Sequence, residues 1–283
     1  MAMTVRTNMA ALSSINSLNK SQSSLGSSLE KISSGLRINR AADDAAGLGV
    51  ATRMESDNTS LKQAMRNTND GISLVQTAEG SIEQLSNILI RFRELSVQAS
   101  NETYTSTDRT MIGEEMEQLK NEYQRITTLA NFNEQSLLNG TGTLSIQVGI
   151  DGTANDRIDL VMTDFSTTQG AISNVGTVFT SVDAGTASIA ESAAANLTEL
   201  DSAINALSTR RAKLGSIQNR FENALSEAST YSQNLSAAQS QILDVDYASE
   251  SANMTRYQIQ SQAGVAALAQ AKAIPQSIIS LLS

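Results

Sequence analysis

The chain has 283 residues and a net charge of −9, with 4% aromatic residues, one proline and no cysteine, histidine or tryptophan. Without cysteine there is no disulfide or thiolate metal site, and without histidine the most frequent general base is missing, so we expect no cofactor, no metal and no enzyme. Residues 1–40 carry +4 and residues 254–283 carry +2, which leaves −15 for the middle. Low charge at the ends suits burial, and no basic stripe predicts nucleic-acid binding.

The first predicted element is a helix over residues 11–36. Apolar residues recur there in steps of three and four, as in a helix that packs along another helix. Ordering about 26 residues costs more conformational free energy than one narrow seam regains, so we expect this helix to need partners. Gly35 is predicted to end it in the left-handed conformation. The seam positions are Ala11, Ile15, Leu18, Gln22, Leu25, Leu29, Ile32 and Leu36.

A connector with Arg37, Asn39, Asp43 and Asp44 is expected to follow. Asp43 or Asp44 is predicted to cap a second helix that runs to about residue 99, a simpler interpretation of this acidic pair than a metal or acid–base site. Residues 105–108 match a capping box and predict a third helix that ends near residue 131.

The sequence pattern then changes to that of strands. Leu144, Ile146, Val148 and Ile150 alternate with smaller or polar residues, which predicts a half-buried strand. Residues 157–162 are the candidate return strand of a hairpin. Residues 163–190 are rich in Gly, Thr, Ser and Ala, and they carry the weakest structural signal.

Helical periodicity returns from about residue 194 to 243, with Arg211 on the seam as a paired or snorkelling residue. Residues 244–252 are predicted to form a second connector. A last helix over residues 254–282 has a seam rich in small residues, and Pro275 is expected to kink or restart it. Its predicted assembly residues are Met254, Tyr257, Val265, Leu268, Ile278 and Leu282.

These elements predict a mainly α fold, an elongated antiparallel helical bundle or coiled coil with both termini paired and a small β-hairpin region in the middle. The apolar runs are shorter than the roughly 18 residues of a membrane span, so no membrane insertion is expected. The N-terminus does not show the pattern of a Sec-type signal, and none is expected.

Several segments in a fixed order closely resemble the bacterial flagellin family. The N-terminal ones are INSLNK at residues 15–20, SSGLRIN at 33–39, ADDAAG at 42–47, RNTNDG at 66–71, QTAEG at 76–80 and RFRELSVQ at 91–98. The C-terminal ones are RAKLGS at 211–216, NR at 219–220, residues 263–271 and PQSIISLL at 275–282. The weakly matched part is about 163–193.

The resemblance implies a secreted subunit that self-assembles into the flagellar filament. Residues 1–42 and 244–283 would be the two halves of an inner coiled-coil domain with its connectors. Residues 43–193 would begin an outer helical rod with the hairpin at about 140–165 and a short variable segment at about 163–193, and residues 194–243 would complete it. Implied partners are identical subunits, an export chaperone and the type III export apparatus, hook-associated and cap proteins, and host innate receptors.

In flagellins that bind a Toll-like receptor, an Arg, a Leu and a Glu are important, and they correspond here to Arg91, Leu95 and Glu115. A simpler interpretation of these charges is a solvated helix face with ion pairs. One alternative function is a hook–filament junction protein with the same terminal helices. Another is an enzyme that uses carboxylates or Ser and Lys in residues 140–190.

Overall fold

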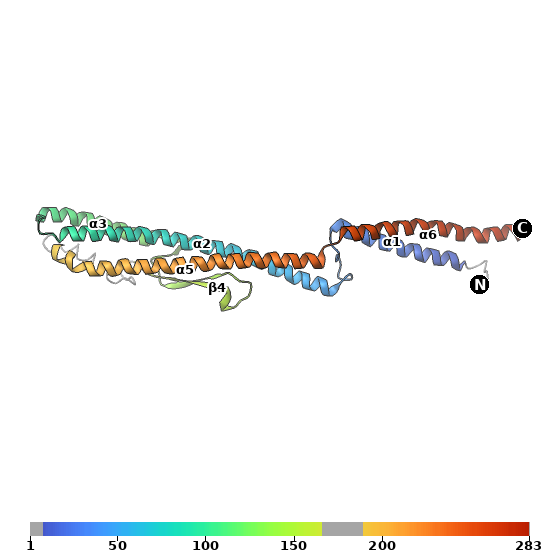
Figure 1. The fold of residues 1–283 in the computed structure, drawn as a ribbon, viewed down its shortest axis with the longest axis horizontal. Helices are drawn as coiled ribbons and strands as arrows, with labels where there is room; N and C mark the ends of the chain where they lie inside the picture. Colours follow the sequence, from blue (N-terminus) through green and yellow to red (C-terminus); the bar gives the residue numbers. More distant parts are fainter. Residues whose placement is uncertain (1–7, 166–188, 283) are drawn as a thin grey trace. The chain divides into compact units, whose positions relative to one another are not determined.

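The structure, a computed structural model, describes residues 8–165 and 189–282, with side chains for residues 8–165 and 197–273 (Figure 1). Most of the expected variable segment therefore lies outside the described residues. The helices are α1 (Met9–Ser34), α2 (Ala45–Ala99), α3 (Ser106–Leu129), α5 (Ile189–Leu243) and α6 (Tyr247–Leu282). The strands are β1 (Asn131–Phe132), β2 (Gln135–Ser136), β3 (Gly142–Gln147) and β4 (Arg157–Met162), with a short 3-10 helix at Ala154–Asp156. The predicted mainly α fold with a small β region is confirmed.

The predicted helix boundaries follow from capping chemistry. Gly35 ends α1 with a φ of 73°, the left-handed conformation that glycine adopts without strain. Asp44 caps α2, since its Oδ1 accepts a hydrogen bond of 2.8 Å from the Gly47 amide. Thr105 and Asp108 form the predicted capping box of α3. These predictions are confirmed.

Two predictions about the C-terminal part are wrong. The second connector is shorter than residues 244–252, because the Asp246 carboxylate accepts hydrogen bonds from the amides of Ala248 and Ser249 and so starts α6 at Tyr247. Pro275 does not restart the helix either, since α6 continues to Leu282, while the alternative expectation of a kink stays a prediction. A proline removes a single helical hydrogen bond, and the other bonds maintain the helix on both sides of it.

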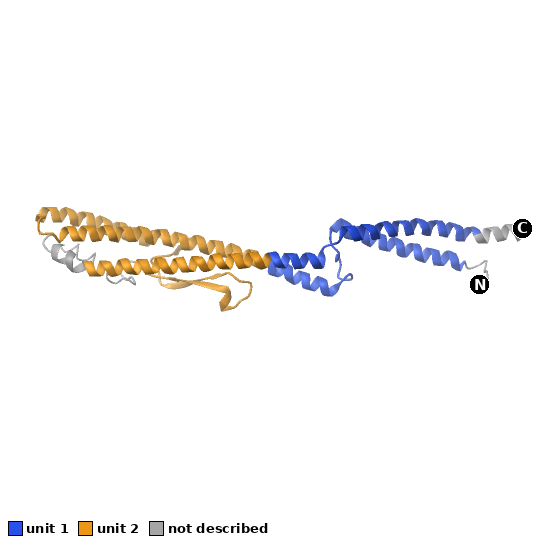
Figure 2. Ribbon diagram, viewed as in Figure 1, with its two compact units in different colours: residues 1–58, 233–283 blue, residues 59–232 orange. Residues whose placement is uncertain are grey.

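The chain divides into two compact units (Figure 2). Unit 1 comprises residues 1–58 and 233–283, and unit 2 comprises residues 59–232. Both divisions fall inside long helices, α2 and α5, whereas the predicted domain boundaries coincide with the connectors. The assignment of inner and outer domains stays a prediction.

Unit 2 has a hydrophobic core to which α2, α3, α5 and the β3–β4 hairpin all contribute. The two strands are antiparallel, with Leu144 opposite Leu160 and Ile146 opposite Ile158, so the apolar residues share one face. This confirms the predicted hairpin, although β3 ends at Gln147, so Val148 and Ile150 lie beyond the strand that was expected to include them. The largest fully buried side chains of the unit include Ile82, Leu85, Leu89, Phe92, Met116, Tyr123, Leu200, Leu207 and Phe221.

A second hairpin, β1–β2, was not predicted from the sequence. Its two-residue turn consists of Asn133 and Glu134, with φ values of 47° and 66°. Two consecutive residues with positive φ match the turn that suits the twist of a hairpin. Asn133 is a residue typical of such turns, but the second turn residue is usually glycine. Because glutamate stands there, the sequence does not show the usual pattern of a hairpin turn.

Two glycines of α2 provide a matched test of this packing. A Cβ at Gly71 would lie 2.9 Å from Phe221 Cζ and 3.0 Å from Ile146 Cδ1, whereas a Cβ at Gly80 meets nothing within 4 Å. We expect Gly80→Ala to raise the free energy of unfolding by about 0.5–1 kcal/mol through helix propensity. Gly71→Ala should lower it by about 1–2 kcal/mol because Phe221 is fully buried and must shift. Urea unfolding followed by circular dichroism measures both, and equal effects of the two changes would contradict the packing described here.

Candidate assembly surface

The terminal helices α1 and α6 pack against each other in antiparallel orientation within unit 1 (Figure 1). At one end of the pair the buried Ser28 hydroxyl donates a hydrogen bond to Glu250 Oε1, and the Tyr247 hydroxyl donates to the Ile32 carbonyl at 3.2 Å. At the other end Asn8 Nδ2 donates to the Ala271 carbonyl at 2.8 Å. The predicted pairing of the termini is therefore present within one chain.

The inner seam of α1, the row of its residues least exposed to solvent, alternates apolar side chains with serines. A Cβ at Gly264 of α6 would lie 3.7 Å from Leu18 Cβ, so the two backbones approach closely. Small residues on both helices permit this approach. The row consists of Ala11, Ser14, Leu18, Ser21, Leu25, Ser28 and Ile32.

This seam differs from the predicted one at alternate positions. Ile15, Gln22 and Leu29 are exposed, and Leu36 lies beyond the helix end in a β-bridge with Asp244. A repeat of 3.5 residues fits two neighbouring faces of one helix, and α6 packs on the face that carries the serines. Ile15, Gln22 and Leu29 therefore do not contact α6 within the chain, and their role in contacts between subunits stays a prediction.

The exposed positions form a second row along α1, which we call the outer seam: Leu12, Ile15, Asn19, Gln22, Gly26 and Leu29. These positions again alternate in steps of three and four, and none is charged. Leu12 is 49% exposed and Leu29 is 50% exposed, and Met9 is exposed near the start of the helix. A helix face of this pattern is typical of one that packs along another helix.

Of the residues predicted on α6, Met254, Tyr257 and Leu268 are partly buried, whereas Val265 is exposed, as is Ile259. Ile278 and Leu282 belong to α6, but their side chains lie outside the described residues. The predicted assembly residues are thus divided between the contact with α1 and exposed surfaces.

The connector after α1 is held to the end of α5 by backbone and side-chain contacts. The Arg37 amide donates to the Leu243 carbonyl at 2.5 Å, and its guanidinium Nη2 donates to the Ile242 carbonyl at 2.8 Å. That carbonyl belongs to the last turn of α5, where a cation is favourable. Asn39 Nδ2 donates to Ser34 Oγ at 3.0 Å.

Asp43 organises the turn of the connector. Its Oδ2 accepts hydrogen bonds from the backbone amides of Arg40 at 3.0 Å and Asn39 at 3.1 Å. These two bonds, first that from Arg40, lower the pKa of the Asp43 carboxyl because they stabilise its charged form. Asp43 and Asp44 thus have separate structural roles.

The three residues of the predicted receptor epitope are not equivalent. Arg91 Nη2 lies 2.7 Å from Glu115 Oε1, and its Nη1 lies 3.0 Å from Glu94 Oε2, so the two predicted charges do meet on the surface. Leu95 is only 2% exposed and belongs to the core of unit 2. A direct contact through Leu95 is therefore not available in this conformation.

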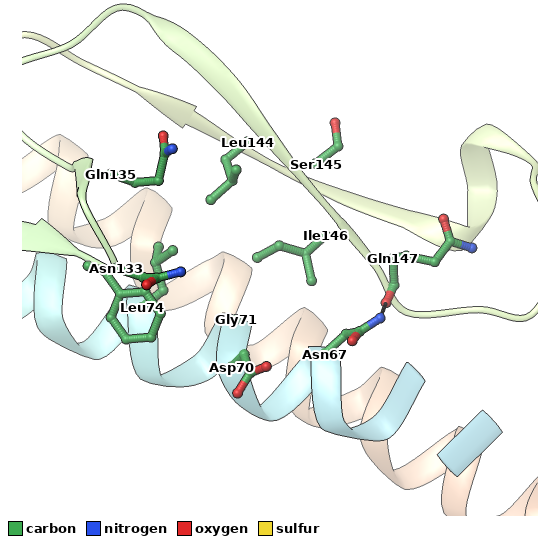
Figure 3. Close-up of a pocket in the computed structure, with 11 residues that line it drawn as sticks. Asn67, Asp70, Gly71, Leu74, Asn133, Gln135, Leu144, Ser145, Ile146 and Gln147 are labelled. Atoms are coloured by element: carbon green, nitrogen blue, oxygen red, sulfur yellow. Dashed lines mark hydrogen bonds between the residues drawn. The ribbon is translucent and has the colours of Figure 1, made fainter. Parts of the chain in front are cut away.

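A hollow of about 430 Å³ lies between α2 and the two hairpins (Figure 3). Leu144 and Ile146 point toward α2, while Ser145 points away and donates a hydrogen bond of 2.6 Å to Asp159 (Figure 3). Asn67 Nδ2 donates to the Gln147 carbonyl at 3.3 Å across the hollow. Asp70 is the one charged residue of the lining, which otherwise offers amides and apolar groups.

Within the described residues, no three His, Cys, Asp or Glu side chains lie close enough together to hold a metal ion. Among those same residues, no helix combines the length and apolarity needed to span a bilayer.

Comparison with known proteins gives a consistent result. Residues 5–143 match the family model of the bacterial flagellin N-terminal helical region, and residues 197–282 match that of the C-terminal helical region. The chain belongs to the bacterial flagellin family. It is 42% identical to a flagellin of Halalkalibacterium halodurans over 90% of both chains. It is 38% identical to a flagellin of Bacillus subtilis over 99% of this chain and 100% of the relative.

One solved structure is similar to this flagellin in fold alone. It is described as a putative flagellar hook-associated protein from Vibrio parahaemolyticus and has a TM-score of 0.60 with 13% sequence identity. The match covers 71% of this chain and 100% of that chain.

Sequence reasoning missed the polar contacts that fix the α1–α6 pair of this flagellin. Ser28 lies outside the predicted seam, although serines at positions 14, 21 and 28 repeat every seven residues. Glu250 was assigned to the second connector. Asn8 lies before the predicted start of the helix, and asparagine at that place was an available capping signal.

The Asp43 carboxylate makes the connector sensitive to acid. Its pKa is lowered in the folded chain, so its stabilising effect is present above the ordinary pKa near 4 and is lost as the pH falls through the lower folded value. We expect the amide protection of residues 39 and 40 to decrease between about pH 5 and pH 3. Asp43→Asn keeps an acceptor oxygen but does not titrate, so in this variant the amide protection of residues 39 and 40 should not change with pH over this range. Hydrogen exchange measures both, and an equally steep decrease in Asp43→Asn would contradict this role.

Proposed function

We propose that this chain is the structural subunit of a bacterial flagellar filament and acts by self-assembly rather than by turnover. The observation that carries the proposal is the outer seam of α1, a second uncharged row of helix-packing positions that α6 leaves exposed. Relatives that cover nearly the whole chain include flagellins and flagellar filament core proteins, and family membership supports a structural protein and not an enzyme.

The energetics of the terminal helices support assembly as the event that completes their burial. In one chain α1 packs along a single partner, and its inner seam contains three serines. Each half-exposed apolar side chain that another subunit covers would contribute about 1 kcal/mol. Several such side chains repeated on every subunit offset the entropy cost of ordering the ends, so folding of the ends and polymerisation are coupled.

Secretion and delivery to the filament tip are further parts of the proposal. Terminal helices that are marginal before assembly suit passage through a narrow type III export channel in an unfolded state. Before export, a chaperone would bind the uncovered apolar rows of α1 and α6. Hook-associated and cap proteins would contact these helices at the two ends of the filament.

Recognition by a host innate receptor is proposed for the surface around Arg91 and Glu115. Their ion pair is half-exposed, and Ile90 and Val97 are exposed nearby on α2. Leu95 would act by shaping the core beneath this surface rather than by contact.

The alternative of a hook–filament junction protein has weaker support. It rests on a structural likeness at 13% identity, whereas flagellin relatives reach 42%. Seeded growth separates the two functions, because a junction protein would add to the seeds without continued elongation.

Deletion of either terminal helix tests the proposed function. We expect chains without residues 1–36 or residues 254–283 to retain most of the helix content of unit 2 and to form no filaments. Circular dichroism and electron microscopy after seeding measure the two results, with the full chain as the control. Filaments from either truncated chain would exclude the proposal.

The outer seam predicts a graded effect of a single substitution. Leu29→Ser removes a half-exposed side chain whose burial between subunits is worth about 1 kcal/mol, so the critical concentration for elongation should rise roughly fivefold. Leu129→Ser in α3 makes the same change at an exposed position of unit 2 and should change that concentration less than twofold. Sedimentation of seeded polymers provides the measurement, and equal effects of the two substitutions would show that the outer seam has no special role.

A further inference from the structure

The inner seam of the α1–α6 pair does not by itself determine the register in which the two helices pack. The inner seam repeats with a period of seven residues, since Ser14, Ser21 and Ser28 are identical and Leu18, Leu25 and Ile32 are nearly so. Sliding α1 by seven residues would place serine on serine and an aliphatic side chain at most aliphatic positions. Seam packing alone therefore distinguishes these registers poorly.

The buried bond between Ser28 and Glu250 does not determine the register in one direction either. If α1 moves by seven residues so that Ser21 takes the place of Ser28, a serine hydroxyl again faces Glu250. The register must be marked by a group that occurs once along the pair.

Pro275 provides such a mark on α6. In a regular helix the carbonyl of residue 271 accepts the amide hydrogen of residue 275, but proline has none. The chain contains a single proline, so this is the one place within its helices where a proline frees a carbonyl. Ala271, which bears that carbonyl, is buried at 8% exposure, where an unpaired acceptor is costly.

Asn8 meets this carbonyl while it also starts α1. Its Oδ1 accepts the Ala11 amide at 3.0 Å as the helix cap, and its Nδ2 donates to the Ala271 carbonyl at 2.8 Å. Both ends of one planar amide are thus used, one within α1 and one across to α6. Between this contact and Ser28–Glu250, the described residues show no other hydrogen bond from α1 to α6.

We propose that Asn8 fixes the register of the N-terminal end of α1 on α6, far from the connector, by binding the backbone carbonyl that Pro275 leaves free. It is a positioning residue for the assembly function proposed above. In a subunit with slipped terminal helices, the outer seam would be displaced along the helix axis relative to the neighbouring subunit that it contacts. The connector sets the register at one end of the pair, and Asn8 sets it at the other. Its capping role makes the first turn of α1 depend on the same contact.

The lack of native cysteine permits a direct test of register in the full-length chain. Leu18 Cβ lies 3.7 Å from an ideal Cβ at Gly264, a separation that suits a disulfide. Leu18→Cys with Gly264→Cys therefore reports the native register, and Ala11→Cys with Gly264→Cys reports the slipped one. We expect Asn8→Asp, which keeps the cap oxygen but loses the donor, to increase the ratio of slipped to native cross-link about fivefold.

Asn16→Asp is the matched control, since it adds the same charge at an exposed position of α1 and should leave the ratio within twofold. A second arm introduces Pro275→Ala, which gives the carbonyl of residue 271 a helical partner, so Asn8→Asp should then change the ratio less than twofold. A cap-only role for Asn8 predicts no effect of Asn8→Asp, because aspartate caps helices well, and that result would overturn the proposal.

An unchanged effect in the Pro275→Ala background would also overturn it. The cross-links form within one chain, so they report register even if the wild-type protein forms no filaments. Failure of seeded elongation would instead contradict the proposed function. The two hypotheses can therefore fail separately.

Discussion

The antiparallel contact between α1 and α6 is the constraint on which the folding of unit 1 of this flagellin depends. The two helices come from opposite ends of the sequence, so the chain must fold back on itself before either can be covered. Their contact is narrow because serine, glycine and alanine occupy much of it. Such a contact allows close approach but removes little apolar surface from water, so it specifies geometry more than it supplies stability.

Unit 2, in contrast, buries much apolar surface within a single chain. Helices α2, α3 and α5 and the β3–β4 hairpin enclose a core with large apolar side chains, including Phe92, Tyr123 and Phe221. Burial of the Tyr123 phenol, together with the nearby Asp164 charge, raises its pKa, as expected for a group removed from water. The two units therefore differ in burial: unit 2 has a hydrophobic core within a single chain, whereas unit 1 leaves rows of apolar positions exposed.

The sequence predicts those features that depend on local chemistry. Gly35, Asp44 and the Thr105–Asp108 box define helix ends because each acts on its own backbone neighbours. The β3–β4 hairpin follows from alternation along two short segments. The face of α1 that meets α6 is less predictable, since a 3.5-residue repeat allows Ser14 or Ile15 equally and the partner decides between them. The bond from Asn8 to Ala271 joins residues at opposite ends of the chain and is visible only once the helices are placed.

The uncharged character of the outer seam has a thermodynamic consequence. Contacts made through Leu12, Ile15, Asn19, Gln22, Gly26 and Leu29 would gain little from Coulomb attraction and much from the release of water. Association through such a surface has a negative heat-capacity change and weakens on cooling, while it responds weakly to dilute salt. A polymer held in this way would be most vulnerable near the freezing point of its medium, and its cohesion would change little between fresh and brackish water.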